Sequence, residues 1–319
     1  MNIKRRILVL TWLSLALPAF ALVPPKISAP ETSVPQDAAA VESGSSFVLG
    51  SWNMEWFPGH SPKVEKSQKQ IDAVEKVLDE EKPAIFMCCE IRGLGALKLL
   101  QLDYPYMACT NIPRVAEAAQ QSAGTLPMQG IGLLSKVPWK EVWTLDFSEL
   151  PEAPERPPRG VLGALFVLPN GRQLTVYGVH LKSNRGDAET DRMERESAID
   201  YIEWDWQRRQ LDPAKDNIVI MGDFNTSPND PKFAEEKTIR RLLSAGFVSA
   251  AQGLPAEQRT TLPGKGKYPD NDFDHILISS SLRALMAGDP PWLKIVKVPE
   301  AASDHNALFL DVTNWVAPK

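Results

Sequence analysis

The sequence predicts an α/β domain in which helices cover mixed β-sheets. Two observations support this class. Apolar, strand-like runs alternate with helical segments from about residue 47 onward, and such alternation is typical of layered α/β folds. An Asn170-Gly171 pair lies between two apolar runs, which is a strong signal for a β-hairpin. Hairpins together with helical crossovers imply that the sheets contain both antiparallel and parallel strand pairs.

The individual elements follow from periodicity and from the residues that interrupt it. Ile71, Val74, Val77 and Leu78 recur at helical spacing, and Pro83 ends that helix. Further helices are expected over residues 187–210 and near 231–246. Strands are expected over residues 47–57, 84–91, 130–136, 161–183 (as a hairpin), 217–225, 273–279 and 306–312.

The first 21 residues form a predicted signal peptide. Three basic residues, Lys4–Arg6, precede the apolar run Ile7–Phe20, and Ala19–Ala21 has the small-x-small form of a cleavage site. An uncleaved membrane anchor is the alternative, but the run is short and Pro18 interrupts it. We therefore expect cleavage after Ala21 and export of the mature chain, which is then periplasmic or secreted.

A linker separates this segment from the folded domain. Residues 22–46 are rich in Pro, Ala and Ser, and we expect a flexible tether without structure. The chain has 319 residues, 43% of them hydrophobic, which is enough for a sizeable core. Because no repeat or second linker follows, we expect one domain over residues 47–319.

The charge balance limits the classes of function. The formal net charge is −5, and removal of the three basic residues of the signal peptide brings it to −8. An acidic chain does not bind nucleic acid through bulk electrostatics, which need a basic surface. The balance thus argues against a passive nucleic-acid binder and leaves an enzyme with a metal-bridged site open.

Three cysteines, Cys88, Cys89 and Cys109, give an odd count for an exported protein. The first two lie within an apolar run and are interpreted as buried small side chains. One disulfide between Cys109 and either of them stays open. No Cys-x-x-Cys spacing occurs, so the sequence does not suggest a zinc site.

Polar residues able to contact a metal or a phosphate stand at one strand end after another. Each of them alone has an ordinary explanation, such as a turn former or a structural histidine. Their repetition in one domain is what indicates a site. Three of the four histidines lie in these segments, and His60 is the exception. The set comprises Asn53, Glu55, Glu90, His180, Asp223, Asn225, Asp274, Asp304 and His305.

This set suits metal-assisted attack on a phosphate ester. Carboxylate and amide oxygens are hard ligands, which suit Mg²⁺, Mn²⁺ or Ca²⁺ rather than zinc. A histidine oriented by a carboxylate would take a proton from water. A second histidine and an asparagine amide would hold the phosphoryl oxygens as charge develops. Asp223 and Asn225, two residues apart on an extended segment, project to the same face.

In this order, the motifs resemble the endonuclease/exonuclease/phosphatase superfamily, which has the deoxyribonuclease-I-like fold. The matching stretches are "WNME", "CCE", "YGVHLKS", "GDFN", "DFDHILIS" and "SDH", and they span about residues 47–312. The resemblance implies a four-layer α/β sandwich, with two mixed sheets face to face and helices outside. It also implies a divalent-metal-dependent phosphoesterase.

The resemblance carries roles to individual residues. It implies metal binding by Glu90, with Asn53 in or beside the same site, and an acidic role for Asp304. We assign all three residues to the metal site. His180 resembles the histidine that contacts the scissile phosphate. In the same comparison Asp223 and Asn225 resemble the pair that orients water and phosphate, and His305 resembles the general base, paired with Asp274.

Three further residues are candidates for substrate binding. Glu55 stands where many family members have another polar side chain, so its role is less defined. Arg159 lies before a strand and Lys182 closely follows His180. For Arg159 a solvated arginine is an equally good interpretation. Lys265, in the loop before Asp274, also stands where it would guide an anionic substrate, although such loops are more often solvated turns.

The expected substrate is a phosphate ester, with nucleic acid as the first choice. A histidine at position 180 resembles the residue that secreted nucleases, sphingomyelinases and phosphatases of this superfamily have there. It argues against abasic-site repair, because the repair enzymes have a different residue at that place. A phospholipid phosphodiesterase is less expected, because no long apolar hairpin is present to enter a bilayer. The motifs are also compatible with a small-molecule phosphatase and, less well, with a binding protein that has lost catalytic activity. We expect a monomer.

Overall fold

The computed structural model describes residues 22–34, 46–61, 63–110, 129–151, 156–168, 170–286 and 290–316. The predicted signal peptide lies outside these residues, as do residues 35–45 of the predicted linker. Two mixed β-sheets of seven strands each form the centre of the molecule. Across the residues just named, no helix is both long enough and apolar enough to span a bilayer.

Sheet A has the strand order β1-β7-β8-β9-β10-β12-β11. In chain order its strands are β1 (Lys26–Ser28), β7 (Trp139–Asp146), β8 (Val161–Val167), β9 (Gln173–His180), β10 (Ile218–Asp223), β11 (Phe247–Ser249) and β12 (Asp274–Ser279). Only β9 and β10 pair in parallel, and their register places His180 opposite Asp223. The β8–β9 hairpin turns at Asn170-Gly171 as predicted, with Gly171 at a φ of 77°.

Sheet B has the strand order β13-β14-β3-β4-β6-β5-β2. In chain order its strands are β2 (Glu31–Ser33), β3 (Val48–Phe57), β4 (Ile85–Ile91), β5 (Tyr106–Cys109), β6 (Gly130–Ser135), β13 (Leu293–Val296) and β14 (Ala307–Asp311). Its parallel pair is β3–β4, which places Asn53 opposite Cys89. In each sheet, therefore, one parallel pair brings two carboxyl ends to the same edge.

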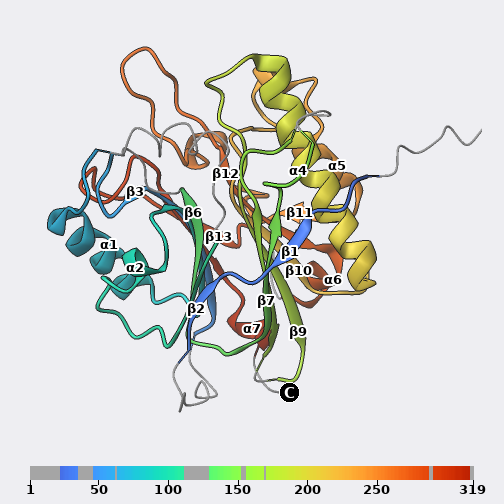
Figure 1. The fold of residues 1–319 in the computed structure, drawn as a ribbon, viewed down its shortest axis with the longest axis horizontal. Helices are drawn as coiled ribbons and strands as arrows, with labels where there is room; N and C mark the ends of the chain where they lie inside the picture. Colours follow the sequence, from blue (N-terminus) through green and yellow to red (C-terminus); the bar gives the residue numbers. More distant parts are fainter. Residues whose placement is uncertain are drawn as a thin grey trace, which may run out of the picture.

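Three apolar layers separate the sheets and the helices. One lies between the sheets and includes Leu49 and Met87 from sheet B with Val176 and Met221 from sheet A. A second lies between sheet B and the helices α1 (Gln68–Glu81) and α2 (Leu94–Leu97), and a third between sheet A and the helices α4 (Ala188–Arg209) and α5 (Thr238–Ser244). Figure 1 shows these helices on opposite outer sides of the sheet pair. The predicted four-layer sandwich is confirmed.

The two long helices begin and end as their sequences predict. Ser67 caps α1 by accepting a hydrogen bond from the Gln70 backbone, and Lys82 ends it in a left-handed conformation. Asp187 caps α4, which has acidic residues in its first turn and basic residues in its last. The helix expected near residues 231–246 is divided into the 3₁₀ turn η1 (Pro231–Phe233) and α5. Among the described residues, the remaining short helices are η2 (Ala256–Gln258), α6 (Ser280–Leu285) and α7 (Thr313–Val316).

The prediction of an unstructured linker is wrong for residues 22–34. β1 pairs with β7 at the edge of sheet A, and β2 pairs with β5 at the edge of sheet B. This segment therefore runs from one sheet to the other, as the blue ribbon in Figure 1 shows. Extended Pro-containing chain is suited to a sheet edge, where its outward N–H groups need no partner.

The three cysteines are buried and free. Cys88 and Cys109 lie opposite the same residue, Gly132, from the two strands that flank β6. Their Cα atoms are thus two strand spacings apart, about 10 Å, which exceeds the reach of a disulfide. The thiol of Cys89 instead donates a hydrogen bond to Val179 O at 3.1 Å.

Candidate active site

The predicted site residues gather where the parallel strand pairs of both sheets end. β3 and β4 supply Asn53 and Glu90, and β9 and β10 supply His180 and Asp223. β12 is antiparallel to β10, so its first residue, Asp274, lies opposite Asp223. The segment before β14 adds Asp304 and His305.

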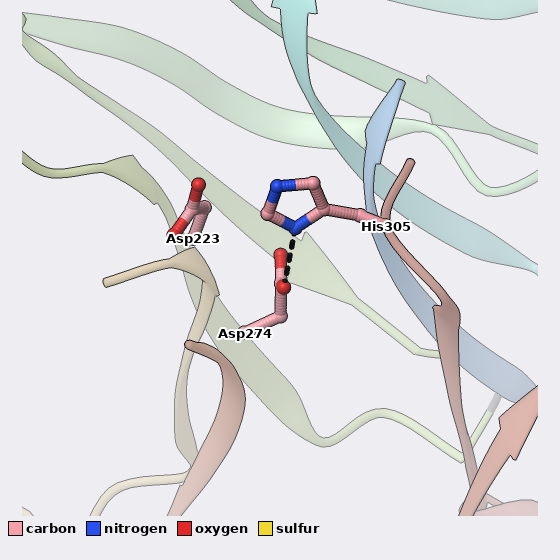
Figure 2. Close-up of side chains that lie close together, drawn as sticks. All are labelled: Asp223, Asp274 and His305. Carbon is pink, nitrogen blue, oxygen red and sulfur yellow. Dashed lines mark hydrogen bonds and ion pairs between the residues drawn. The ribbon is translucent and has the colours of Figure 1, made fainter. Parts of the chain in front are cut away.

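A buried histidine–aspartate pair forms the centre of the site. His305 Nδ1 lies 2.7 Å from Asp274 Oδ2, and the two side chains are 8% and 0% exposed. Figure 2 shows the carboxylates of Asp223 and Asp274 beside the His305 ring. One ligand atom from each of these three residues lies within 4.8 Å of the others. The predicted pairing of His305 with Asp274 is therefore present in the structure.

Backbone contacts across the two sheets hold this pair in place. Ser303 Oγ donates a hydrogen bond to Asn53 O at 2.7 Å and accepts one from the His305 backbone at 3.0 Å. Trp52 Nε1 donates to His305 O at 2.8 Å. On the other side, the Asp274 backbone donates to Thr261 Oγ1 at 2.9 Å. The histidine is thus fixed by sheet B, and its carboxylate partner belongs to sheet A.

The charges of this group shift one another's protonation. Burial raises the pKa of Asp223 from its usual 3.8 to about 7, and the charge of Asp274 adds to that shift. Burial lowers the pKa of His305, but the charge and hydrogen bond of Asp274 outweigh it and raise the pKa to about 10. The site therefore retains protons at neutral pH, as closely spaced buried carboxylates require.

Asn53 and His180 lie between two carboxylates that come from different sheets. Asn53 Nδ2 donates to Asp223 Oδ2 at 3.0 Å and to Glu90 Oε1 at 3.3 Å. His180 Nε2 is 3.7 Å from the same two oxygens, and its side chain is 2% exposed. Glu90 and Asp223 therefore face each other across a small space bounded by an amide and an imidazole.

Asn225 is fixed beside Asp223. Its backbone N–H donates to Asp223 Oδ1 at 2.8 Å, and its side-chain Nδ2 donates to Leu181 O at 3.1 Å. Asn225 has a φ of 53°, and Glu55, Trp56 and Glu90 have φ values between 44° and 61°. Non-glycine residues in this left-handed region are strained and concentrate at functional sites. These four residues lie in the segments that present the polar side chains, whereas Lys82 and Gln210 have this conformation at the ends of helices.

Sequence reasoning missed His60, which pairs with Glu55. His60 Nδ1 lies 2.7 Å from Glu55 Oε2, and His60 Nε2 lies 2.8 Å from Ala301 O. Burial raises the pKa of Glu55, and the hydrogen bond to His60 opposes that shift. The contact depends on a turn after β3 and on the segment before Ser303, so the sequence carried no signal for it.

The three remaining candidates lie around this centre. Asp304 is 47% exposed, and its Oδ1 lies 4.0 Å from His305 Nε2. Arg159 donates to Leu181 O at 2.9 Å and to Gln129 Oε1 at 2.7 Å, next to the end of β9. Lys182 is ion-paired with Asp191 of α4. Lys182 is therefore engaged with the helix in this structure, and substrate contact by Arg159 or Lys182 stays a prediction.

The donor set fits a hard divalent cation. Glu90 and Asp223 offer carboxylate oxygens that converge on the same two groups, Asn53 Nδ2 and His180 Nε2. Oxygen donors suit Mg²⁺, Mn²⁺ or Ca²⁺. His305 offers Nε2 alone, because its Nδ1 is bonded to Asp274. Asn53, a predicted metal residue, directs its nitrogen toward the carboxylates, so in this geometry it acts as a hydrogen-bond donor beside them.

Several solved structures share this fold. An endonuclease/exonuclease/phosphatase from Beutenbergia cavernae is 14% identical, with a TM-score of 0.58 over 83% of this chain and 71% of that one. The catalytic domain of human Nocturnin is 16% identical, with a TM-score of 0.57 over 83% and 92%. The 3′ phosphatase NExo from Neisseria, bound to a product DNA hairpin, is 17% identical, with a TM-score of 0.53 over 83% and 98%.

Comparison with curated protein sequences gave no match. The model of one family, described as the Endonuclease/Exonuclease/phosphatase family, matches residues 50–305. This range begins in β3 and ends at His305, so it contains every residue of the predicted site. The chain therefore belongs to the Endonuclease/Exonuclease/phosphatase family, whose members are hydrolytic phosphoesterases.

Proposed function

We propose that this protein is an exported, divalent-metal-dependent phosphodiesterase, and that its substrate is nucleic acid. The observation that carries the proposal is the buried His305–Asp274 pair, in which Nδ1 and Oδ2 are 2.7 Å apart. This pair lies beside Asp223, whose carboxylate also contacts Asn53 and His180. A histidine oriented by a carboxylate is the arrangement that general-base catalysis requires.

His305 is the proposed general base. Its Nδ1–H is directed at Asp274, so Nε2 is the nitrogen that would take a proton from the attacking water. Without a metal ion the pKa of His305 is raised to about 10, so Nε2 is protonated at neutral pH. A cation bound beside Asp223 would lower that pKa and free Nε2 for the role of base. Asp274 stabilises the imidazolium that results, because its buried carboxylate lies in contact with the ring. Asp304 Oδ1, 4.0 Å from Nε2, adds a negative charge on the same side.

Asp223, Asn225 and His180 are the proposed contacts to water and phosphate. Asp223 would orient the attacking water, because its carboxylate faces His305. The Asn225 amide uses one N–H for Leu181 O and carries a second, which would hold a phosphoryl oxygen. His180 Nε2, directed at the Glu90–Asp223 space, would contact another phosphoryl oxygen.

Glu90 and Asp223 are the proposed ligands of a Mg²⁺, Mn²⁺ or Ca²⁺ ion, with Asn53 beside them. When bound, such an ion would neutralise phosphate charge and favour the ionised form of the nearby carboxylates. Asp304 stays a candidate for a second acidic contact. Its exposed carboxylate lies on the far side of His305 from Asp274.

Nucleic acid is the proposed substrate because two structural relatives are described with it. NExo is bound to a product DNA hairpin, and a TDP2 from D. rerio is complexed with single-strand DNA product. The TDP2 structure is 17% identical, with a TM-score of 0.52 over 84% of this chain and 98% of that one. These likenesses concern the fold, so the substrate needs a direct test.

A substrate panel tests the proposal. The mature protein, from Leu22 onward, is incubated with labelled single- and double-stranded DNA and RNA, phosphatidylcholine–sphingomyelin vesicles and p-nitrophenyl phosphate. Each assay is run with Mg²⁺, Mn²⁺, Ca²⁺ and EDTA, and with His180→Ala as a matched control. We expect metal-dependent cleavage of nucleic acid that His180→Ala lowers at least about 100-fold. Cleavage of lipid or of the small ester alone would replace the proposed substrate.

Export is tested separately. The basic residues, the apolar run and Ala19–Ala21 support cleavage after Ala21. Mass spectrometry of the protein recovered from the periplasm or the medium of a Gram-negative host should find Leu22 as the first residue. Recovery of the uncleaved chain in the membrane fraction would contradict this part of the proposal.

A further inference from the structure

A buried arginine in α4 has no place in the mechanism described so far. The Arg195 side chain is 2% exposed, although α4 otherwise presents its long charged side chains at least partly to solvent. Arginine is almost never fully buried unless it is paired. Its position on a surface helix, directed inward toward the catalytic end of sheet A, therefore calls for a specific set of partners.

Arg195 joins two segments that follow catalytic strands. Its Nε and Nη2 donate to the two oxygens of Glu236 at 2.8 Å and 2.7 Å, a bidentate pair in which Glu236 is only 3% exposed. Its Nη1 donates to Lys182 O at 3.0 Å and to Asn184 Oδ1 at 3.2 Å. The first partner precedes α5, and the other two lie in the loop that follows His180.

Asn184 connects this guanidinium to the catalytic strand ends. Its Oδ1 accepts from Arg195, and its Nδ2 donates to Asn225 O at 2.7 Å. The Asn225 side chain in turn donates to Leu181 O, and the Leu181 backbone donates to Asp223 O at 2.8 Å. Two hydrogen bonds therefore separate the Arg195 guanidinium from the backbone of Asn225.

Asn225 is a residue that needs such support. Its φ of 53° is a conformation that persists only where surrounding contacts determine it. The amide of Asn184 uses both of its ends, one toward Arg195 and one toward Asn225. A shift of the loop by a fraction of an ångström would therefore reach both Asn225 and His180.

We propose that Arg195 is a positioning residue for the catalytic site. With Glu236 it holds the loop after β9 through Asn184, and it thereby fixes Asn225 and His180 relative to Asp223. Arg195 does not touch the substrate. The proposal builds on the proposed phosphodiesterase function, but the order of the loop is measured independently of activity.

The test removes the Arg195–Glu236 ion pair without leaving a buried charge. Arg195→Met alone would strand the Glu236 carboxylate, so the main variant is Arg195→Met/Glu236→Leu, in which apolar side chains replace both partners. A second variant, Asn184→Ala, cuts the connection and leaves the ion pair intact. The control is Arg192→Met/Glu189→Leu, which removes an ion pair of the same helix that is exposed and lies one turn earlier.

We expect the main variant to lower kcat about 10- to 100-fold, with KM changed less than about threefold and Tm retained, because small misplacement of catalytic groups slows chemistry to that extent. Asn184→Ala should give a similar loss, and combining it with the main variant should give no further loss. The control should retain kcat. An unchanged kcat in a folded main variant, or additive losses in the combination, would overturn the proposal.

Hydrogen exchange separates this inference from the proposed function. In the main variant the backbone amides of residues 181–186 should exchange at least about tenfold faster, while those in the middle of α4 keep their protection. This result is expected even if none of the tested phosphate esters is cleaved. Unchanged exchange of residues 181–186 would refute the positioning role, whereas an inactive wild-type protein would refute only the phosphodiesterase proposal.

Discussion

Replacing Asp223 by asparagine should stabilise the metal-free protein while it abolishes activity. Asp223 is buried and lies opposite a second carboxylate, Asp274, and burial and that charge raise its pKa from 3.8 to about 7. A raised carboxyl pKa means that the folded state disfavours the ionised form. An asparagine at this position carries no charge to bury, although its single oxygen can accept only one of the two hydrogen bonds that Asp223 accepts from Asn53 and Asn225.

The magnitude follows from the shift. A rise of about 3 pKa units corresponds to roughly 4 kcal/mol of unfolding free energy, at one pKa unit per 1.36 kcal/mol. The folded protein binds the extra proton, so the stability of the wild type falls as pH rises from about 4 to about 7. The figure of roughly 4 kcal/mol is the largest gain in unfolding free energy to expect from Asp223→Asn. The variant also loses the attraction between the Asp223 carboxylate and protonated His305, which reduces the gain.

Urea unfolding in EDTA, at several pH values from 5 to 8, measures the effect. The advantage of Asp223→Asn over the wild type should grow by about 2–3 kcal/mol between pH 5 and pH 8. The control is Asp212→Asn, since Asp212 is exposed and its hydrogen bond to Lys215 lowers its pKa. That change should not stabilise the protein at either pH. A pH-independent difference, or a wild type more stable than Asp223→Asn at pH 8, would refute this reasoning.

Three further predictions address the catalytic pair, the N-terminal segment and the end of β10. Asp274→Asn should lower kcat about 10²- to 10⁴-fold in steady-state assays. It should also lower the pKa of His305, followed by NMR, because the Asp274 carboxylate raises that pKa in the wild type; a retained rate would contradict the role of the pair. Deletion of residues 22–34 removes β1 from the edge of sheet A and β2 from the edge of sheet B. Calorimetry should then show a Tm lower by about 2–4 °C for each kcal/mol of unfolding free energy that is lost, and light scattering should show aggregation through the exposed edges. An unchanged Tm would show that the two strands do not contribute to stability. Gly222→Ala should cost more than about 4 kcal/mol in urea unfolding, since Gly222 has a φ of 142° and a Cβ there would lie 1.9 Å from Val179 O; a stable, active variant would contradict the geometry.

The fold class and the strands of the centre could be predicted because their signals are local. The apolar runs of β4, β9 and β10 and the Asn170-Gly171 turn are readable from sequence, and each is present in the structure. The arrangement in four layers came from the resemblance to a family. Periodicity does not specify which sheet a strand joins, because strand order is set by long-range packing.

The strands missed by sequence reasoning are short and lie at sheet edges. β1 and β2 have three residues each, with Pro30 between them, and their partners β7 and β5 lie far along the chain. A strand of three residues is too short to show the alternation of apolar and polar residues from which strands are predicted. Such a segment becomes a strand only because an unpaired sheet edge is available to it.

At the site, sequence reasoning identified side chains but not the contacts that support them. The ordered motifs named His305, Asp274, Asp223 and the rest of the set, and the structure brings them together. His60 and Arg195 were missed, because their importance depends on contacts with Glu55 in β3 and with Glu236 before α5. A charged residue in an amphipathic helix has the same sequence pattern whether it faces water or the interior.

The most direct test of the proposed nuclease and its base is the nicking of supercoiled plasmid by the mature protein and by His305→Ala, with Mg²⁺, Mn²⁺ or Ca²⁺ and with EDTA. Substrate binding is measured alongside by fluorescence anisotropy. We expect metal-dependent nicking by the wild type and a loss of about 10²- to 10⁴-fold in the variant, with binding retained. Nicking at the wild-type rate by a folded His305→Ala protein would contradict the assignment of the base, and the absence of nicking by the folded wild type in every metal would contradict the proposed nuclease.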